Sequence, residues 1–275
     1  MNKHLQNNDE IALHNHWAEN CDPSEIDIMS VMEGVNAVEN RFLVNSIHAV
    51  FGNTLKGLRI LDVGTGLGES AVYFAKQGAT VTATDISPGM ISLCRKLAKQ
   101  HKVTDKIEFI VSSAELLPRN KGRYDIIYAV NLLHHLKDAE SFMKTASNNL
   151  KSPGLFLSYD PIESNPAVNV YRKLAQKVRS ANERPLEINF VKTVSKYFSS
   201  IKHREFWFFA QLLFLKYYFV NHIDPNDTRY WKLIHYKRNR CGERVMKFLH
   251  AVDRIPLSFP LINSWAWNMA IVARR

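Results

Sequence analysis

Residues 61–70 read LDVGTGLGES, in which an apolar run ends in three closely spaced glycines. Leu58–Val63 is typical of a short buried strand, and the apolar positions of Ser70–Gln77 recur at helical spacing. A glycine-rich turn between a strand and a helix lets a ligand approach the backbone at the strand's carboxyl end. Dinucleotide-binding loops use the spacing GxGxxG, whereas this chain has Glu69 at the third position.

The residues that follow alternate between strand-like and helix-like patterns. Ser87-Pro88 is a typical helix start, and Lys151–Gly154 reads as a turn. Strands separated by helices predict a doubly wound, seven-stranded, mostly parallel α/β sheet with helices on both faces. The further strands expected are Thr80–Thr84, Ile107–Val111, Tyr124–Val130, Leu155–Tyr159, Ile201–Phe209 and Trp265–Ala273, and the further helices are Met90–His101 and Ala139–Leu150.

An acidic residue, Asp85, follows the second predicted strand, 21 positions after Gly64. A carboxylate there can accept hydrogen bonds from both hydroxyls of a ribose. No Gly-Lys-Ser/Thr follows the glycine turn, which excludes a P-loop. The sequence therefore predicts a nucleoside ligand that needs no pyrophosphate.

Five motifs, in order, resemble those of the class I S-adenosylmethionine-dependent methyltransferases over roughly residues 58–160. They are Asp62–Gly68, Asp85-Ile86, Ser113–Pro118, Tyr124–Leu136 and Leu150–Gly154. Many relatives carry Asp at the position of Ser113, whose hydroxyl is a weaker acceptor for the adenine amino group. The resemblance implies a Rossmann-like methyltransferase fold and S-adenosylmethionine as the cofactor, bound by Asp62, Gly64, Gly66, Gly68, Asp85, Ile86, Met90, Ser113, Ala114, Glu115 and Asn131.

Two histidines, His134 and His135, follow the fourth predicted strand, where this fold would place its substrate. His134, nearer the strand end, is the candidate general base toward a hydroxyl or amine because the ordinary pKa of histidine suits neutral pH. The alternative is that both histidines only begin the next helix. Asn131 is expected to line the pocket beside them and is the second candidate catalytic residue.

Asp160 is a candidate for orienting a substrate or, equally, for capping the turn before Pro161. Arg41 is a candidate partner for the cofactor's carboxylate. We expect no metal site, because adjacent histidines should point in different directions and no third ligand stands at a suitable spacing.

The chain is expected to divide into an N-terminal helical cover (1–57), a cofactor-binding α/β core (58–160) and a C-terminal part (161–275) with a substrate lid or insertion and the last two strands. Residues 1–160 carry a formal net charge of −2 and residues 161–275 carry +12. This asymmetry favours a basic C-terminal surface that faces an acidic substrate or an anionic membrane, with a solvated basic face as the alternative.

Phe206–Val220 is the most apolar stretch, and its second half is expected to form a helix lining a hydrophobic substrate pocket. Residues 230–240 interleave aromatic residues with cations, among them Lys237, Arg238 and Arg240. Such a segment can stack on nucleic acid, lie on an anionic membrane or close over an acidic or aromatic small molecule.

The function predicted from these features is methyl transfer from S-adenosylmethionine to a small molecule, apolar or aromatic and in some cases anionic, with O- or N-methylation favoured. The alternatives are an RNA methyltransferase and a non-catalytic cofactor-binding or scaffold protein. The end of the fourth strand reads NLLHH, unlike the Asn/Asp-Pro-Pro-Tyr/Phe signature of many nucleic-acid methyltransferases, so nucleic acid is disfavoured as a partner. Three scattered cysteines (Cys21, Cys94 and Cys241) and a polar N-terminus indicate a cytoplasmic protein.

Overall fold

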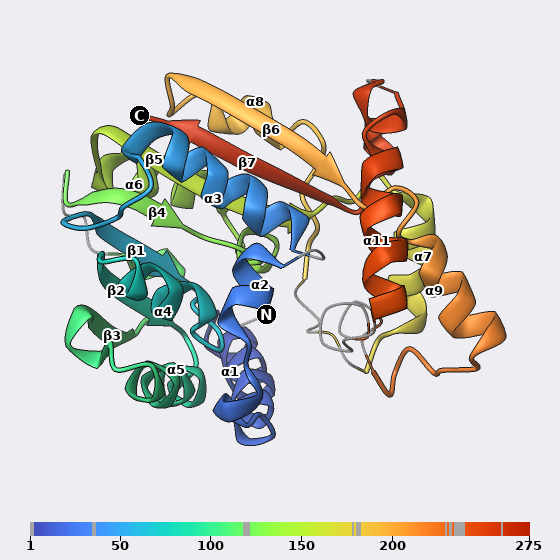
Figure 1. The fold of residues 1–275 in the computed structure, drawn as a ribbon, viewed down its shortest axis with the longest axis horizontal. Helices are drawn as coiled ribbons and strands as arrows, with labels where there is room; N and C mark the ends of the chain where they lie inside the picture. The colour runs from blue at the N-terminus through green and yellow to red at the C-terminus, as the bar shows by residue number, and fades with distance from the viewer. Residues whose placement is uncertain are drawn as a thin grey trace.

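The computed structural model describes residues 3–34, 37–117, 122–177, 179, 183–228, 230, 233, 240–259 and 261–275. One seven-stranded sheet runs through the molecule in the order β3-β2-β1-β4-β5-β7-β6, with β7 antiparallel to both of its neighbours (Figure 1). The predicted mostly parallel α/β fold is thereby confirmed. The strands are β1 (Arg59–Val63), β2 (Thr80–Asp85), β3 (Ile107–Val111), β4 (Tyr124–Tyr128), β5 (Leu150–Pro161), β6 (Ser200–Phe206) and β7 (Asn268–Arg274).

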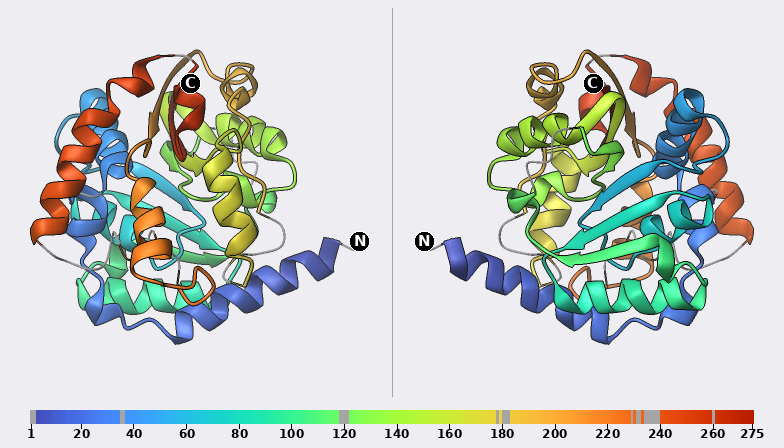
Figure 2. Two further views of the ribbon diagram at one scale, coloured as in Figure 1. Left: turned by 90° about the vertical axis from the view of Figure 1, so that its right-hand side faces the viewer. Right: turned by 90° about the vertical axis from the view of Figure 1, so that its left-hand side faces the viewer.

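Helices cover both faces of the sheet. One face carries α3, α4 and α5, and the other carries α6 and α8. Figure 2 shows α1 running alongside α5, and Figure 1 shows α7, α9 and α11 beyond the carboxyl end of β6. The helices are α1 (Lys3–Glu19), α2 (Ile28–Glu33), α3 (Val38–Phe51), α4 (Glu69–Lys76), α5 (Pro88–Gln100), α6 (Ala139–Asn149), α7 (Pro166–Leu174), α8 (Phe190–Val194), α9 (Leu212–Leu215) and α11 (Arg240–Asp253).

Local sequence explains where the core elements begin. The side chain of Ser87 accepts a hydrogen bond from the Met90 N–H at 3.0 Å, and Pro88 occupies the first turn of α5, as predicted. The strand order reverses between β1 and β4, so their carboxyl ends diverge and leave a crevice above the sheet. In the described part of the chain, no helix combines the length and apolar character that a membrane crossing requires.

Several element boundaries differ from those predicted. Lys151–Gly154 belongs to β5 rather than to a turn, because Leu150 pairs with Tyr124 before the register shifts. β6 ends at Phe206, since Trp207 adopts a left-handed φ of 69° that an extended strand does not allow. β7 starts only at Asn268, after the short 3-10 turn η7 (Asn263–Trp265).

Candidate functional site

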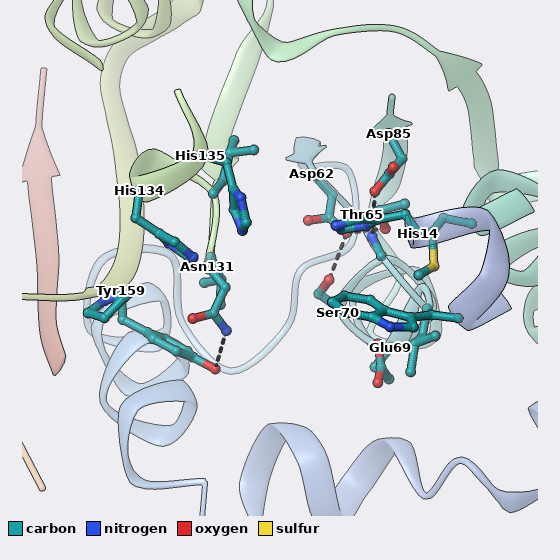
Figure 3. Close-up of a pocket in the computed structure, with 18 of the residues that line it drawn as sticks. His14, Asp62, Thr65, Glu69, Ser70, Asp85, Asn131, His134, His135 and Tyr159 are labelled. Carbon is teal, nitrogen blue, oxygen red and sulfur yellow. Dashed lines mark hydrogen bonds between the residues drawn. The ribbon is translucent and has the colours of Figure 1, made fainter. Parts of the chain in front are cut away.

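A cavity of about 1060 Å³ opens above the carboxyl ends of β1, β2, β4 and β5. Figure 3 shows two groups of side chains facing each other across it. We call them the glycine-loop side, which comprises Asp62, Thr65, Glu69, Ser70 and Asp85, and the histidine side, which comprises Asn131, His134, His135 and Tyr159.

Asp62 is the central acid of the glycine-loop side and is 2% exposed. Its Oδ2 accepts hydrogen bonds from Thr65 Oγ1 at 2.6 Å and from Ser70 Oγ at 2.7 Å. Burial raises the pKa of Asp62 to about 6, the two hydroxyl groups lower it, and nearby Asp85 raises it. The acid is therefore held in place and is ionised only near or above neutral pH.

Asp85 connects the glycine loop to the start of α5. Its Oδ2 accepts the Gly66 N–H at 3.0 Å, and its Oδ1 accepts the Ser87 N–H at 2.9 Å. Burial raises the pKa of Asp85, whereas the two backbone hydrogen bonds lower it. Each carboxylate oxygen has a second lone pair, so Asp85 can also accept hydrogen bonds from a ligand in the cavity.

The glycines of the loop have different roles. Gly66, at φ +54°, lines the cavity, and a Cβ added there would meet no atom within 4 Å. Gly64 also lines the cavity, whereas Gly68 is not among the lining residues. A Cβ at Gly68 would lie 2.5 Å from Cys94 Sγ, so this glycine lets α4 pack against α5. The predicted contact of Gly68 with a cofactor stays a prediction.

Five more of the predicted cofactor residues line the cavity beyond β2 and β3, namely Ile86, Met90, Ser113, Ala114 and Glu115. The last one, Asn131, lies on the histidine side. Met90 is buried, and Ser113 Oγ accepts the Glu115 N–H at 3.3 Å. Their contact with a cofactor stays a prediction, but their position beside Asp85 is consistent with an adenine site.

Helix α1 contributes residues that the sequence analysis missed. Asn15 Oδ1 accepts hydrogen bonds from Ser87 Oγ at 2.7 Å and from the Gly89 N–H at 3.0 Å, which ties α1 to the start of α5. Glu10 Oε1 lies 2.9 Å from His135 Nδ1, so α1 also reaches the histidine side. Polar residues without an apolar pattern gave no signal for these long-range contacts.

Asn131 lies in the loop after β4, which ends at Tyr128 rather than at Val130. Its φ of 52° is left-handed, a conformation that asparagine tolerates better than most residues. The Asn131 side chain donates a hydrogen bond to Tyr159 Oη at 3.1 Å (Figure 3), and its backbone N–H donates to the Tyr159 carbonyl at 2.8 Å. Asn131 therefore lines the pocket and holds the end of β5.

His134 and Asp160 form a buried pair. The Nδ1 atom of His134 lies 2.8 Å from Asp160 Oδ1, and the side chain of Asp160 is fully buried. Burial raises the pKa of Asp160 well above its ordinary range, whereas the backbone N–H groups of residues 132–134 lower it. Asp160 is not among the residues that line the cavity, so direct contact with a substrate is not what its position supports. It holds His134 and accepts backbone N–H groups of the turn after β4.

The two adjacent histidines point the same way, contrary to expectation, with ring centroids 4.1 Å apart (Figure 3). Ligand atoms of His134, His135 and Glu183 lie within 4.8 Å of one another. Each has an ionic partner in the structure, namely Asp160, Glu10 and Arg179 respectively. The three residues thus form an ion-pair network, and the expected lack of a metal stays a prediction.

The other end of the cavity, beyond β5 and β7, is walled by Tyr171, Trp207 and Trp267. Trp267 lies with its ring centroid 5.7 Å from that of Tyr171 and 6.3 Å from that of Trp207. We call this the acceptor end, and we include in it the lining residues Arg172, Arg179, Glu183 and Arg184.

Two expectations about residues that line the cavity are wrong, and a third concerns residues that the structure does not describe. Of Phe206–Val220 only Trp207 lines the cavity, and Leu212, Leu215, Phe219 and Val220 are more than half exposed. Arg41 is not a lining residue either. Lys237 and Arg238 lie outside the described residues, as does the side chain of Arg240.

The order of the strands, the glycine loop after β1 and the acid Asp85 at the end of β2 together define the class I S-adenosylmethionine-dependent methyltransferase fold. Residues 61–158 match the family described as "Methyltransferase domain". This segment, which is less than half of the chain, is similar to that family.

Among curated proteins, the chain is similar to ubiquinone biosynthesis O-methyltransferases. That of Coxiella burnetii (strain Dugway 5J108-111) is 31% identical over 143 residues, which are 52% of this chain and 57% of the relative. That of Rickettsia canadensis (strain McKiel) is 28% identical over 153 residues, which are 56% of this chain and 60% of the relative. The chain thus matches less than two thirds of the length of these relatives.

Solved structures share the fold. A putative sarcosine dimethylglycine methyltransferase from Galdieria sulphuraria superposes with a TM-score of 0.56 at 15% identity, covering 86% of each chain. Phospholethanolamine N-methyltransferase 2 of Haemonchus contortus superposes with a TM-score of 0.54 at 17% identity, covering 90% of this chain and 59% of the other. At such identities the likeness concerns the fold alone.

The family's cofactor is S-adenosylmethionine, and the residues present fit it. Gly66 leaves open space beside the loop backbone, and Asp85 can accept hydrogen bonds from ribose hydroxyls. Ile86 and Met90 offer apolar surface for an adenine ring, and Asp62 offers a carboxylate for an ammonium group.

Proposed function

We propose that this protein transfers a methyl group from S-adenosylmethionine to a hydroxyl oxygen of a small aromatic or apolar acceptor. The observation that carries the proposal is the His134–Asp160 pair, of which His134 faces the cofactor-fitting glycine-loop side across the cavity. S-adenosylmethionine supplies an electrophilic methyl group. The chain positions the acceptor and removes the hydroxyl proton.

Proton removal depends on which nitrogen of His134 carries a hydrogen. When Asp160 is ionised, His134 donates its Nδ1–H to that carboxylate, and the Nε2 lone pair can take the acceptor's proton. When Asp160 carries a proton, Nδ1 must accept it, and Nε2 then holds a hydrogen. The pair is therefore a base only after it has lost one proton, so turnover should rise with pH.

The acceptor class follows from the walls of the acceptor end. Tyr171, Trp207 and Trp267 offer ring faces and edges against which an aromatic or apolar group can pack. The O-methyltransferase relatives support an oxygen acceptor over nitrogen. We place this chemistry in the cytoplasm, in keeping with the three scattered cysteines.

An acceptor screen tests the proposal. Phenols and hydroxylated aromatic acids are incubated with S-adenosylmethionine, and mass spectrometry detects products that gain one methyl group. We expect His134→Gln to lower kcat by about 10²–10⁴-fold, with unchanged affinity for S-adenosylhomocysteine. His101→Gln, outside the cavity, is the control. Full activity of His134→Gln would show that His134 is not the general base.

Two other functions are separated by the same screen. The cyclase SpnF shares the fold with a TM-score of 0.50 at 13% identity, so the fold alone does not dictate methyl transfer. Binding of S-adenosylhomocysteine without turnover of any acceptor would favour a cofactor-binding scaffold. Methylation of added RNA, but of no small molecule, would favour the RNA methyltransferase.

A further inference from the structure

Three arginines line the acceptor end of the cavity: Arg172 on α7, and Arg179 and Arg184 beyond it. Glu183 pairs with Arg179. Burial lowers the pKa of Arg172 to about 10, and nearby Arg179 lowers it further, against the attraction of Glu183 and Glu163. Positive charge in a sheltered wall favours an anion as its partner.

The guanidinium group of Arg172 is held from one side only. Its Nη1 donates to Asn169 Oδ1 at 3.1 Å and to the Ile162 carbonyl at 3.5 Å. The Nε and Nη2 atoms are buried and have no hydrogen-bond partner among the described residues. These two atoms carry parallel N–H groups along one edge of the guanidinium, the edge that matches two carboxylate oxygens.

Backbone contacts connect this arginine to the candidate base. Ile162, which accepts from Arg172, lies two residues after Asp160 on the same chain segment. On the other side, the Arg184 N–H donates to the His134 carbonyl at 2.7 Å. Tyr171 and Trp267, whose ring centroids lie 5.7 Å apart, line the same cavity as Arg172 and His134.

We infer that Arg172 binds the carboxylate group of the acceptor, so that the substrates are hydroxylated aromatic acids. This inference rests on the proposed function for the identity of the acceptor, but the carboxylate site can be tested by binding alone. The Nε and Nη2 edge of the Arg172 guanidinium pairs with the carboxylate, and Arg184 adds positive charge. The rings of Tyr171 and Trp267 pack against the aromatic ring of the acceptor.

Binding is measured by calorimetry with S-adenosylhomocysteine saturating. The probes are 4-hydroxybenzoate and 4-hydroxycinnamate, each compared with its methyl ester. We expect the acids to bind about 10- to 100-fold more tightly than the esters, as charge-assisted hydrogen bonds require. Arg172→Gln should abolish this difference in affinity between acids and esters. Arg172→Lys should retain part of it, because lysine keeps the charge but lacks the two parallel N–H groups. Lys173→Gln, exposed on the same helix, is the matched control.

A nuclear magnetic resonance signal provides a readout that does not involve activity. The Nε–Hε signal that disappears in Arg172→Gln should shift when an acid is added and stay in place with its ester. Equal affinity for acids and esters would overturn the inference. So would a loss of S-adenosylhomocysteine affinity in Arg172→Gln, which would assign the residue to the cofactor. Tight acid binding without methyl transfer would instead contradict only the proposed function.

Discussion

At the scale of single residues, Gly66 is the sharpest test of the cofactor site. Its φ of +54° strains a β-branched residue, and its missing side chain leaves room in the cavity. Gly66→Val should abolish S-adenosylhomocysteine binding in calorimetry, while thermal unfolding shows a destabilisation of about 1–2 kcal/mol. Gly57→Val is the control, since Gly57 has φ +84°, nothing within 4 Å of a Cβ, and no place in the cavity. Equal loss of binding in both variants would point to strain instead of lost space.

The raised pKa of Asp62 makes cofactor binding depend on pH. In the protein its pKa is about 6 instead of 3.8, so the free site holds a proton below pH 6. A bound ammonium group favours the ionised acid and lowers its pKa, so binding releases a proton and strengthens as pH rises through about 6. Calorimetry in buffers of different ionisation enthalpy measures this release. Asp62→Asn should bind weakly and without the pH dependence; a flat wild-type profile would exclude Asp62 as the ammonium partner.

At the scale of elements, local signals were enough to predict most of the core. The glycine turn after β1 and the Ser87 cap of α5 are set by neighbouring residues, so their positions could be predicted. Lys151–Gly154 could not be, because pairing with β4 overrides the local turn preference. The His134–Asp160 contact joins residues 26 positions apart, and periodicity does not tell which side chains meet across a sheet edge.

Asn15 is the side chain that joins helix α1 to the start of α5 beside the cofactor site. Asn15→Ala removes two hydrogen bonds to residues 87 and 89, each worth about 0.5–1.5 kcal/mol. We expect faster amide hydrogen exchange in α1 and faster cofactor dissociation in stopped-flow measurements. Asn8→Ala is the control because Asn8 is exposed on the same helix and does not line the cavity. Unchanged exchange in Asn15→Ala would show that α1 is held by packing against α5 alone.

At the scale of the whole molecule, the cavity is electrically polarised. Three acids, Asp62, Glu69 and Asp85, lie on the glycine-loop side. Three arginines line the acceptor end, together with the two acids Glu39 and Glu183. The formal net charge of the sequence has the same asymmetry: it is −2 in residues 1–160 and +12 in residues 161–275. This polarity suits a cationic methyl donor at one end and an anionic acceptor at the other. It also favours the donor over its neutral, demethylated product, which helps the product leave.

Glu69 allows this polarity to be measured. Burial raises its pKa to about 7, with a further rise from Asp62, so it is ionised near pH 8 and protonated near pH 6. A carboxylate roughly 10 Å from a sulfonium contributes about 1.7 kcal/mol at an effective dielectric constant near 20, before salt screens it. Glu69→Gln should therefore reduce the preference for S-adenosylmethionine over S-adenosylhomocysteine by about 3- to 10-fold near pH 8. The wild-type preference should shrink toward pH 6, whereas that of Glu69→Gln should change less. Calorimetry with both ligands decides this, with Glu187→Gln, exposed and outside the cavity, as the control. Equal weakening of both ligands would mean that Glu69 shapes the loop and does not act through its charge.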